Sequence, residues 1–590
     1  MDMKSSNLNS TQPDPSKTVK DCFSFIKADP ASQKYSVESS TPVQIAFSLQ
    51  EWCLHLIHDA NFRHEIFSEM QAGLIDMPAF VSHLACAFAQ VPPTLIKEEN
   101  RFSYKNWNLW PFNFYSQSFM FVKQWWMNVF GSVPGVNQHK TDVLRFTMLQ
   151  FLECLSPANF LYTNPVLIDK TIATKGLNLF DGYANFLNDA YRLYLKLPPE
   201  GIKYFKVGRE LAITEGVVVL RNELMELIQY KPTTLKAKLE PILIVPAWIM
   251  KYYILDLRPE NSMVKYLVDH GYSVFIISWK NPTSEDRSLG LEDYVNLGVL
   301  QAMDRINQIL NNQRIHGVGY CLGGTLLSMV AAKLARDQDK RLASITLLAA
   351  QTDFTQPGDI GVFIDKYQIS LIESVMRPSG YLDSAKMSGA FQMIGSADRK
   401  WAQMTKEYVL GERPEMSDLM AWNADGTRLP ICMHLQYLTH MYLNNDLAMG
   451  RYKLDSRPID LSDIKAPIFA LAAKQDFVAP WRSVYKLHQY VHGDIEFVLT
   501  SGGHNAGIIN PPASKKHSSF QHLKRSSGNE SLNAQVWLEK APIESGSWWP
   551  YWLNWLNEHS DSQLDTPIYL GAANSQMNTL GPAPGTYVLH

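Results

Sequence analysis

Apolar residues recur at three- to four-residue spacing through the first third of the chain, from about residue 42 to residue 197. The stretches 143–155 and 184–197 keep this spacing over several turns, which is the period of an amphipathic helix. Residues 1–40 are instead rich in Ser, Asn, Pro and Lys, a composition that favours a loose tail. The pattern therefore predicts a tail at 1–40 and a helical domain at 41–205.

Beyond residue 206 the pattern changes to short apolar runs separated by helical segments. Such alternation is typical of a mostly parallel sheet with helices on both faces. It breaks off at about 352–458, a segment rich in Trp, Met and Tyr, which we interpret as a cap inserted after the sixth strand. A domain at 206–590 that includes this cap is predicted. The expected strands are 216–220, 224–230, 241–245, 273–278, 315–319, 344–349, 468–472 and 495–499.

Charge and cysteine content narrow the functional classes. The net charge is −3 over 590 residues, which argues against nucleic acid as a main partner because phosphate binding needs a basic surface. The cysteines form no Cys-x-x-Cys pair and no cluster with histidine. We therefore expect no metal site and no disulfide framework, and we expect a reducing compartment. The cysteines are at positions 22, 53, 86, 154, 321 and 432.

The sequence also predicts a cytoplasmic protein without a membrane span. Residues 1–31 are polar and lack the basic segment and apolar run of a signal peptide. No uninterrupted apolar stretch reaches the roughly 18 residues that a spanning helix needs.

The most informative motif is Gly-Tyr-Cys-Leu-Gly-Gly-Thr at 319–325, between a predicted strand and a predicted helix. A Gly-x-nucleophile-x-Gly sequence at such a junction is typical of the nucleophile elbow of the α/β-hydrolase fold. The helix N-terminus presents backbone N–H groups and a positive dipole end, which stabilise an oxyanion and favour a thiolate. We interpret Cys321 as the nucleophile, although small residues also line tight turns for purely structural reasons.

An acid and a histidine should follow the nucleophile, each on a loop after a later strand. Asp476 follows the strand at 468–472, and His504 follows the strand at 495–499. Each has an ordinary structural use, Asp476 as a turn or helix cap and His504 as a surface or core residue. Their order and their position after strands favour a catalytic triad of Cys321, Asp476 and His504.

Backbone groups are the expected oxyanion donors. The N–H of Leu322 is the first candidate because it directly follows the nucleophile. The second donor usually comes from the loop after the third strand, where the N–H groups near Trp248 and Ile249 are the candidates. Among the other cysteines, Cys432 is the one whose place in the predicted cap would let it reach the site. The cysteines at 22, 53, 86 and 154 are expected to be inert thiols.

These residues resemble the polyhydroxyalkanoate synthases, particularly the single-subunit class I type. The resemblance covers most of the chain, in one order, and is far more specific than the triad alone. The shared motifs are Asn-Arg-Phe at 100–102, Leu-Ser-Pro-Ala-Asn-Phe at 155–160, Lys-Tyr-Tyr-Ile-Leu-Asp at 251–256, Gly-Tyr-Cys-Leu-Gly-Gly at 319–324, Trp-Asn-Ala-Asp-Gly-Thr at 422–427, Gly-His at 503–504, Gly-Ser-Trp-Trp-Pro at 546–550 and Pro-Ala-Pro-Gly-Thr-Tyr at 582–587.

The resemblance implies polymerisation of (R)-3-hydroxyacyl-CoA, such as 3-hydroxybutyryl-CoA, into an intracellular polyester. CoA would be released as the leaving group, and no cofactor would be needed. Cys321 would carry the acyl chain, His504 would deprotonate its thiol, and Asp476 would help to activate the 3-hydroxyl group of the incoming unit. The resemblance also implies a homodimer associated with polyester granules.

Three departures from the family pattern suggest a divergent branch. Phe477 follows Asp476 where relatives typically carry His, and Met250 stands where many relatives have Asn. The histidine loop reads Ser-Gly-Gly-His, with one more glycine than the commoner form. Substrate range and polymer output are the properties that such changes would alter.

Two other functions stay open at this point. A thioesterase or polyester depolymerase on the same fold would pass the acyl group to water. A non-enzymatic granule protein would use its aromatic surface to bind polymer and would not acylate Cys321. Release of CoA without polymer would identify the first, and failure of acylation would identify the second.

Overall fold

The computed structural model describes residues 99–130, 138–387, 397–513, 518–561, 563–564 and 579–590. The predicted tail at 1–40 therefore lies outside the described residues. The chain divides into two compact units. The sheet unit includes Tyr204–Met393 and Asp418–His590, and the helical unit includes Val37–Lys203 and Ile394–Ser417. Each unit is treated by itself below, in its described part.

The sheet unit is organised around one ten-stranded sheet in the order β1-β2-β5-β4-β6-β7-β12-β13-β14-β15. Neighbouring strands run parallel from β5 to β13 and antiparallel at both edges. The predicted parallel sheet is confirmed. The strands are β1 (Gly216–Arg221), β2 (Met225–Tyr230), β4 (Ile242–Val245), β5 (Val274–Trp279), β6 (Ile315–Tyr320), β7 (Leu342–Leu348), β12 (Ile468–Ala473), β13 (Ile495–Thr500), β14 (Ser519–Arg525) and β15 (Ile543–Ser545).

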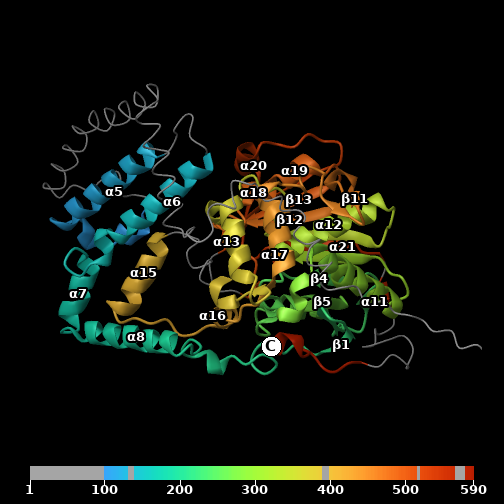
Figure 1. Ribbon diagram of the computed structural model, residues 1–590, viewed down its shortest axis with the longest axis horizontal. Coiled ribbons are helices and arrows are strands. Elements are labelled where there is room, and N and C mark those ends of the chain that lie inside the picture. The colour runs from blue at the N-terminus through green and yellow to red at the C-terminus, as the bar shows by residue number, and fades with distance from the viewer. Residues whose placement is uncertain (1–98, 131–137, 388–396, 514–517, 562, 565–578) are drawn as a thin grey trace, which may run out of the picture. The chain divides into compact units, whose positions relative to one another are not determined.

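Helices and short hairpins fill the connections between these strands (Figure 1). The α-helices are α9 (Met263–Asp269), α10 (Leu291–Asp293), α11 (Gln301–Ile309), α12 (Leu322–Arg336), α13 (Lys366–Met376), α16 (Asp418–Asn423), α17 (Ile431–Tyr437), α18 (Trp481–Tyr485), α19 (Leu487–Tyr490), α20 (Ala534–Lys540) and α21 (Trp549–Glu558). Two π-helical segments are η8 (Tyr294–Leu300) and η10 (Leu438–Leu443). The 3-10 segments are η6 (Tyr252–Asp256), η7 (Ser284–Ser288), η9 (Asp359–Phe363), η11 (Leu461–Asp463) and η12 (Tyr587–Leu589). The two-residue strands pair as β3 (Ala237–Lys238) with β16 (Gln563–Leu564), β8 (Tyr381–Leu382) with β9 (Leu429–Pro430), and β10 (Lys453–Leu454) with β11 (Arg457–Pro458).

The two faces of the sheet are covered by different helices. Successive residues of a strand point to opposite faces. A Cβ on Gly317 of β6 would lie 3.1 Å from the side chain of Leu327 in α12, so α12 packs on that face. The ring of His316, the preceding residue, makes a 3.0 Å hydrogen bond with Ser560, just beyond α21. The central strands are thus buried on both sides, which explains why they read as continuous apolar runs.

The segment predicted as a cap follows β7 and contains η9, α13, β8, α16, β9, α17 and η10. Within the sheet unit, the β8–β9 pair joins the start of this segment to its later part. Residues 394–417, from the middle of the segment, group instead with the helical unit. The insertion thus contributes to two different units.

The helical unit combines the N-terminal helices with one helix from later in the chain. The periodic stretches 143–155 and 184–197 correspond to α6 and α8. A Cβ on Gly182 of α8 would lie 2.2 Å from the carbonyl oxygen of Tyr408, so glycine permits the close approach of α15 (Figure 1). The elements are η2 (Asn100–Phe102), η3 (Lys105–Asn108), α5 (Phe112–Val129), α6 (Gln138–Cys154), η4 (Pro157–Asn159), α7 (Pro165–Ala173), α8 (Leu177–Tyr194), η5 (Ile202–Tyr204), whose last residue belongs to the sheet unit, and α15 (Ala397–Tyr408).

A buried carboxylate joins three elements of the helical unit, α6, α5 and η2. Glu153 of α6 is 1% exposed and pairs with two cations, Lys123 of α5 at 2.7 Å and Arg101 of η2. A buried charge is tolerated when it is paired and hydrogen-bonded in this way. The Asn-Arg-Phe motif at 100–102 is therefore structural in this unit.

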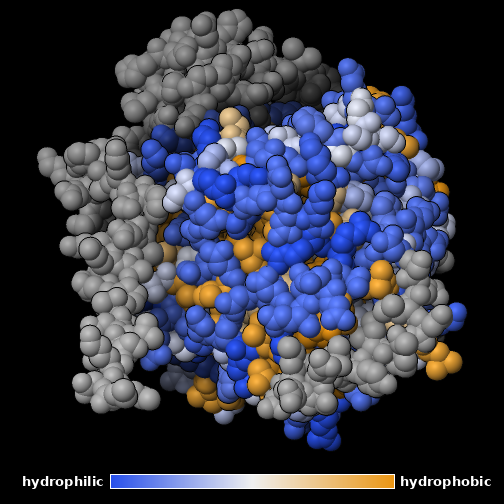
Figure 2. Space-filling model, turned by 90° about the vertical axis from the view of Figure 1, so that its right-hand side faces the viewer, coloured by the Kyte–Doolittle hydropathy of each residue, from blue (hydrophilic) through white to orange (hydrophobic). Residues whose placement is uncertain are grey.

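The amount of exposed apolar surface differs between one face of the sheet unit and helix α8 of the helical unit. Figure 2 looks at the side on which α11 and β11 lie in Figure 1, and it is mostly hydrophilic with small separate apolar groups. In the helical unit, the single helix α8 exposes eight large apolar residues. They are Leu177, Phe180, Tyr183, Phe186, Leu187, Tyr191, Leu193 and Tyr194. Among the residues that the structure describes, no helix combines the length and the apolar character needed to cross a membrane.

The junction of β4 and α12 generates a stability prediction. A Cβ on Gly323 would lie 2.0 Å from the carbonyl oxygen of Val245. This oxygen belongs to the backbone of β4, so it can move away only if the strand shifts. Gly323→Ala should therefore lower the free energy of unfolding by about 1–3 kcal/mol, the usual cost of overpacking. Gly493→Ala is the matched control, because its Cβ would meet only ordinary contacts at 3.5 Å or more. Urea unfolding of both variants measures the difference, and equal midpoints would contradict the packing argument.

Candidate active site

Cys321 occupies a strained turn between β6 and α12. Its backbone has φ 53° and ψ −122°, a conformation that side chains rarely adopt outside functional turns. Its N–H donates to the carbonyl oxygen of Leu348 at 2.9 Å, which ties the turn to the neighbouring strand. A Cβ on Gly319 would lie 2.3 Å from the Cα of Gly324, so the two glycines permit the tight reversal. The motif thus has the local geometry of a nucleophile elbow.

The structure brings His504 and Asp476 together beside this turn. His504 lies on the loop after β13, and its Nδ1 donates to Asp476 Oδ2 at 2.7 Å. The other carboxylate oxygen, Oδ1, accepts from the backbone N–H groups of Val478 at 2.8 Å and Ala479 at 2.9 Å. Asp476 therefore makes the turn contacts of an ordinary loop aspartate with one oxygen and orients the imidazole with the other. Nε2 of His504 is left for the thiol of Cys321, with which the ring interacts.

The electrostatics of His504 favour its charged form. Burial alone would lower the pKa of His504, but the charges of Asp476 and Cys321 and its hydrogen bonds to both raise that pKa well above its ordinary value. The ring also stacks on Tyr320, with centroids 5.7 Å apart and planes at 29°. Tyr320 is held in turn by a 2.7 Å hydrogen bond from its hydroxyl to Asn505 Oδ1. This arrangement suits a histidine that takes a proton from the thiol.

Both candidate oxyanion residues line one pocket with Cys321. Leu322 begins α12, so its N–H belongs to the free N-terminal turn of that helix. Ile249 lies on the loop after β4, next to Trp248. The structure therefore places Leu322 and Ile249 in the pocket lining with Cys321, and His504, held by Asp476, next to Cys321.

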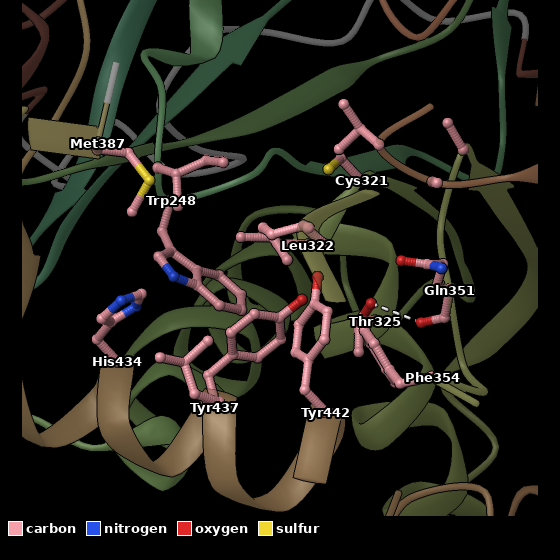
Figure 3. A pocket seen from close by; sticks show the side chains of 16 residues that line it. Trp248, Cys321, Leu322, Thr325, Gln351, Phe354, Met387, His434, Tyr437 and Tyr442 are labelled. Carbon is pink, nitrogen blue, oxygen red and sulfur yellow. Dashed lines mark hydrogen bonds between the residues drawn. The ribbon is translucent and has the colours of Figure 1, made fainter. Parts of the chain in front are cut away.

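The pocket itself is mostly apolar and aromatic (Figure 3). Trp248 packs edge-on against Tyr437 with centroids 5.8 Å apart, and Phe354 does so at 6.0 Å. Burial raises the pKa values of Tyr437 and Tyr442, so both keep their hydroxyl protons at neutral pH. Burial lowers the pKa of His434 to about 4, so this ring is neutral. The lining residues are Trp248, Ile249, Cys321, Leu322, Thr325, Ala349, Gln351, Phe354, Ile360, Met387, His434, Tyr437, Leu438, Tyr442, Val478 and Ala479.

Sequence reasoning did not identify the cap residues of this pocket. His434 and Tyr437 come from α17, and Leu438 and Tyr442 come from η10. An aromatic-rich segment was recognised, but its period gives no sign of which side chains face Cys321. Figure 3 shows the two tyrosine hydroxyls directed from these helices toward the interior of the pocket.

The remaining cysteines lie outside the pocket lining where they are described. Cys432 is buried on α17 and is not among the lining residues. Cys154 is a free thiol of the helical unit. In the described part of the chain, no group of three or more His, Cys, Asp or Glu side chains is placed to hold a metal ion.

Two family models match this chain, one for the fold of the sheet unit and one for the region before it. Residues 240–511 match the family model of the alpha/beta hydrolase fold. The chain is therefore an α/β-hydrolase-fold protein, with a cap segment and an N-terminal helical region. Residues 98–267 match the model described as the N-terminus of poly-beta-hydroxybutyrate polymerase.

Curated relatives identify the family. The chain is 38% identical over 502 residues to the poly(3-hydroxyalkanoate) polymerase of Methylorubrum extorquens, covering 85% of this chain and 81% of that protein. It is 36% identical to the corresponding polymerase subunits of Rhizobium etli, with 84% and 77% covered, and of Cupriavidus necator, with 75% of each covered. The chain belongs to the poly(3-hydroxyalkanoate) polymerases, which are acyltransferases. The resemblance drawn from its motifs is confirmed.

The electrostatics of the His504–Asp476 pair generate a prediction. Asp476→Asn removes the charge that raises the pKa of His504 and leaves the effect of burial, which lowers it. The ring then accepts the thiol proton less readily, so alkylation of Cys321 by iodoacetamide at pH 7 should slow by about tenfold or more. The alkylation profile should also shift to higher pH.

Asp304→Asn is the matched control. Asp304 is an exposed side chain that pairs with Arg341, away from the pocket lining. Its alkylation profile should coincide with that of the unchanged protein. An unchanged profile in Asp476→Asn would show that Asp476 does not set the basicity of His504.

Proposed function

We propose that this chain polymerises (R)-3-hydroxyacyl-CoA, with (R)-3-hydroxybutyryl-CoA as the substrate to test first, through a covalent acyl intermediate on Cys321. CoA is released at each loading step. The observation that carries the proposal is the arrangement of Cys321 on a strained elbow beside a histidine that is held at 2.7 Å by Asp476. The polymerase relatives support the substrate class.

The first step loads the enzyme. His504 Nε2 takes the thiol proton of Cys321, and the sulfur attacks the thioester carbonyl carbon of the substrate. The negative charge that develops on the carbonyl oxygen is stabilised by the backbone N–H groups of Leu322 and Ile249. The carbon–sulfur bond to CoA then breaks, and the imidazolium returns its proton to the departing CoA thiolate. One thioester replaces another, so the step is nearly isoenergetic.

The second step forms the ester. The 3-hydroxyl group of a second substrate or chain gives its proton to His504, and its oxygen attacks the acyl carbon on Cys321. Asp476 stabilises the imidazolium that forms, because its carboxylate accepts from Nδ1. The carbon–sulfur bond to Cys321 breaks, and the thiolate regains a proton from His504.

Transfer to a hydroxyl group requires that water be kept away from the acyl-enzyme. The pocket lining is largely apolar and aromatic, and Cys321 is 9% exposed. Trp248 and Phe354 both pack against Tyr437 there, so an acyl chain in the pocket would contact mainly carbon atoms. This lining supports transferase over hydrolase chemistry on the same fold.

The proposal includes the setting of the reaction. The chemistry described uses only side chains and backbone groups of the chain, so we propose that it needs no metal or other cofactor. We further propose that the enzyme works as a homodimer in the cytoplasm, at the surface of polyester granules. The exposed apolar residues of α8 support contact with an apolar surface or a partner.

A direct assay tests the proposal. Purified protein with (R)-3-hydroxybutyryl-CoA should release CoA and form insoluble polyester in parallel. Cys321→Ala should abolish both, because no acyl acceptor remains. Cys154→Ala is the matched control, since it removes a free thiol of the helical unit and should leave both products unchanged.

The assay also separates the alternatives. Release of CoA with free 3-hydroxybutyrate and no polymer would identify a thioesterase. Degradation of added polyester would identify a depolymerase. Absence of a Cys321 acyl adduct with both short-chain and medium-chain substrates would contradict an enzymatic function and favour a granule-binding protein.

A further inference from the structure

Two motifs that carry the family resemblance have no part in the chemistry described so far. They are Lys-Tyr-Tyr-Ile-Leu-Asp at 251–256 and Trp-Asn-Ala-Asp-Gly-Thr at 422–427. They lie 166 or more residues apart in the sequence, but the structure joins them at the loop that carries Ile249. We call residues 422–427 the clamp segment.

The first contacts come from Thr427 at the end of the clamp segment. Its hydroxyl donates to the carbonyl oxygen of Trp248 at 2.7 Å, and its backbone N–H donates to the carbonyl oxygen of Ile249 at 3.3 Å. The adjacent residues Met250 and Gly426 form an antiparallel bridge. The end of the clamp segment is therefore paired with the loop through an isolated β-bridge and two hydrogen bonds from Thr427.

These contacts determine where the Ile249 N–H points. A trans peptide is planar, so its carbonyl oxygen and the following N–H point in opposite directions. The carbonyl group of Trp248 and the N–H of Ile249 belong to the same peptide. Because Thr427 holds that carbonyl oxygen toward the clamp segment, the N–H of Ile249 is turned away from it. Ile249 lines the pocket of Cys321.

Further contacts fix the far side of the loop. The indole N–H of Trp422 donates to the carbonyl oxygen of Lys251 at 2.7 Å. The hydroxyl of Tyr253 donates to Asp425 at 2.9 Å. The Lys251 ammonium group donates to the carbonyl oxygen of Val588 at 3.0 Å, so its side chain is also held.

Burial makes this arrangement rigid. Thr427 and Tyr253 are each 1% exposed, and Trp422 is 4% exposed. Water cannot replace a lost partner at such positions without a cavity, so a carbonyl group freed from its donor must turn to find another. A turned Trp248 carbonyl group would take the Ile249 N–H with it.

We infer that the clamp segment is a positioning device for the oxyanion donor, and that Thr427 is its principal residue. It acts through Trp248 and does not touch the reacting atoms. The inference rests on the proposed function, in which Ile249 stabilises the oxyanion. It also links the cap to the chemistry, because the clamp segment starts in the last two residues of α16 and ends just before β9, both in the cap. Displacing this part of the cap would disorder the oxyanion donor.

Thr427→Val tests the inference, because valine keeps the shape of threonine and removes the hydroxyl group. Its rate of Cys321 acylation by (R)-3-hydroxybutyryl-CoA should fall about 10- to 100-fold, below the loss for outright removal of an oxyanion donor. The loss should fall on kcat, with KM nearly unchanged, because the interaction matters in the transition state. Thr427→Ser retains the hydroxyl group and should recover most of the rate.

A second readout separates positioning from general damage. Alkylation of Cys321 by iodoacetamide develops no oxyanion, so its rate in Thr427→Val should match the unchanged protein. Thr233→Val is the matched control: it removes a threonine hydroxyl that donates to Asp269 at 2.9 Å, and both rates should stay unchanged. If Thr427→Val does not fold, Trp422→Phe removes one loop donor while keeping an aromatic ring, and the same split is expected.

The outcomes are distinct. Normal acylation by folded Thr427→Val would overturn the inference and leave the proposed function intact. Equal losses of acylation and alkylation would also overturn it, because the variant would then damage the thiol and its base. Failure of the unchanged protein to acylate, with normal alkylation, would overturn the proposed function and this inference with it.

Discussion

The site depends on how closely three backbone segments approach at the end of β6. A side chain at Gly323 would collide with the end of β4, and one at Gly324 would lie 2.4 Å from the Cβ of Ala350, beyond β7. Glycine at both positions lets the first turn of α12 enter the space between the two neighbouring strands. That approach aims the helix N-terminus at the pocket and forces Cys321 into its positive-φ conformation. The positions of Cys321, the proposed nucleophile, and of the Leu322 N–H, a proposed oxyanion donor, thus follow from a single packing constraint.

Parallel strand topology adds the second half of the site. The carboxyl ends of β12 and β13 lie at the same edge as that of β6, so loops far apart in sequence meet there. Formation of the sheet therefore already brings the loops of Asp476 and His504 close together. Their pairing in a buried place then sets the charge on the imidazole, because a carboxylate acts strongly where water is scarce.

Much of this was predictable because it is local. Each central strand was predicted within two residues of its observed bounds, since strands buried on both faces read as short continuous apolar runs. The proposed triad was chosen from motif and chain order, and the structure brings its three residues together. The last two strands of the sheet, β14 and the edge strand β15, were missed, because Ser519–Arg525 is largely polar and Ile543–Ser545 is exposed. Edge strands need not be apolar, so hydrophobicity carries little signal there.

The parts that sequence could not supply are those set by contacts between distant segments. Nothing in the spacing of Trp422 or Thr427 indicates that they bond to the loop at 248–251, because a hydrogen bond to a carbonyl group leaves no trace in the acceptor's side chain. The same holds for Tyr437, whose pocket-facing position follows from how α17 docks. A family resemblance marks such residues without explaining them. In this structure, Tyr437 of the cap lines the pocket, and Trp422 and Thr427 of the cap hold the backbone of the loop at 248–251. In the proposed mechanism, the cover of the pocket and the position of the oxyanion donor therefore depend on the same cap residues.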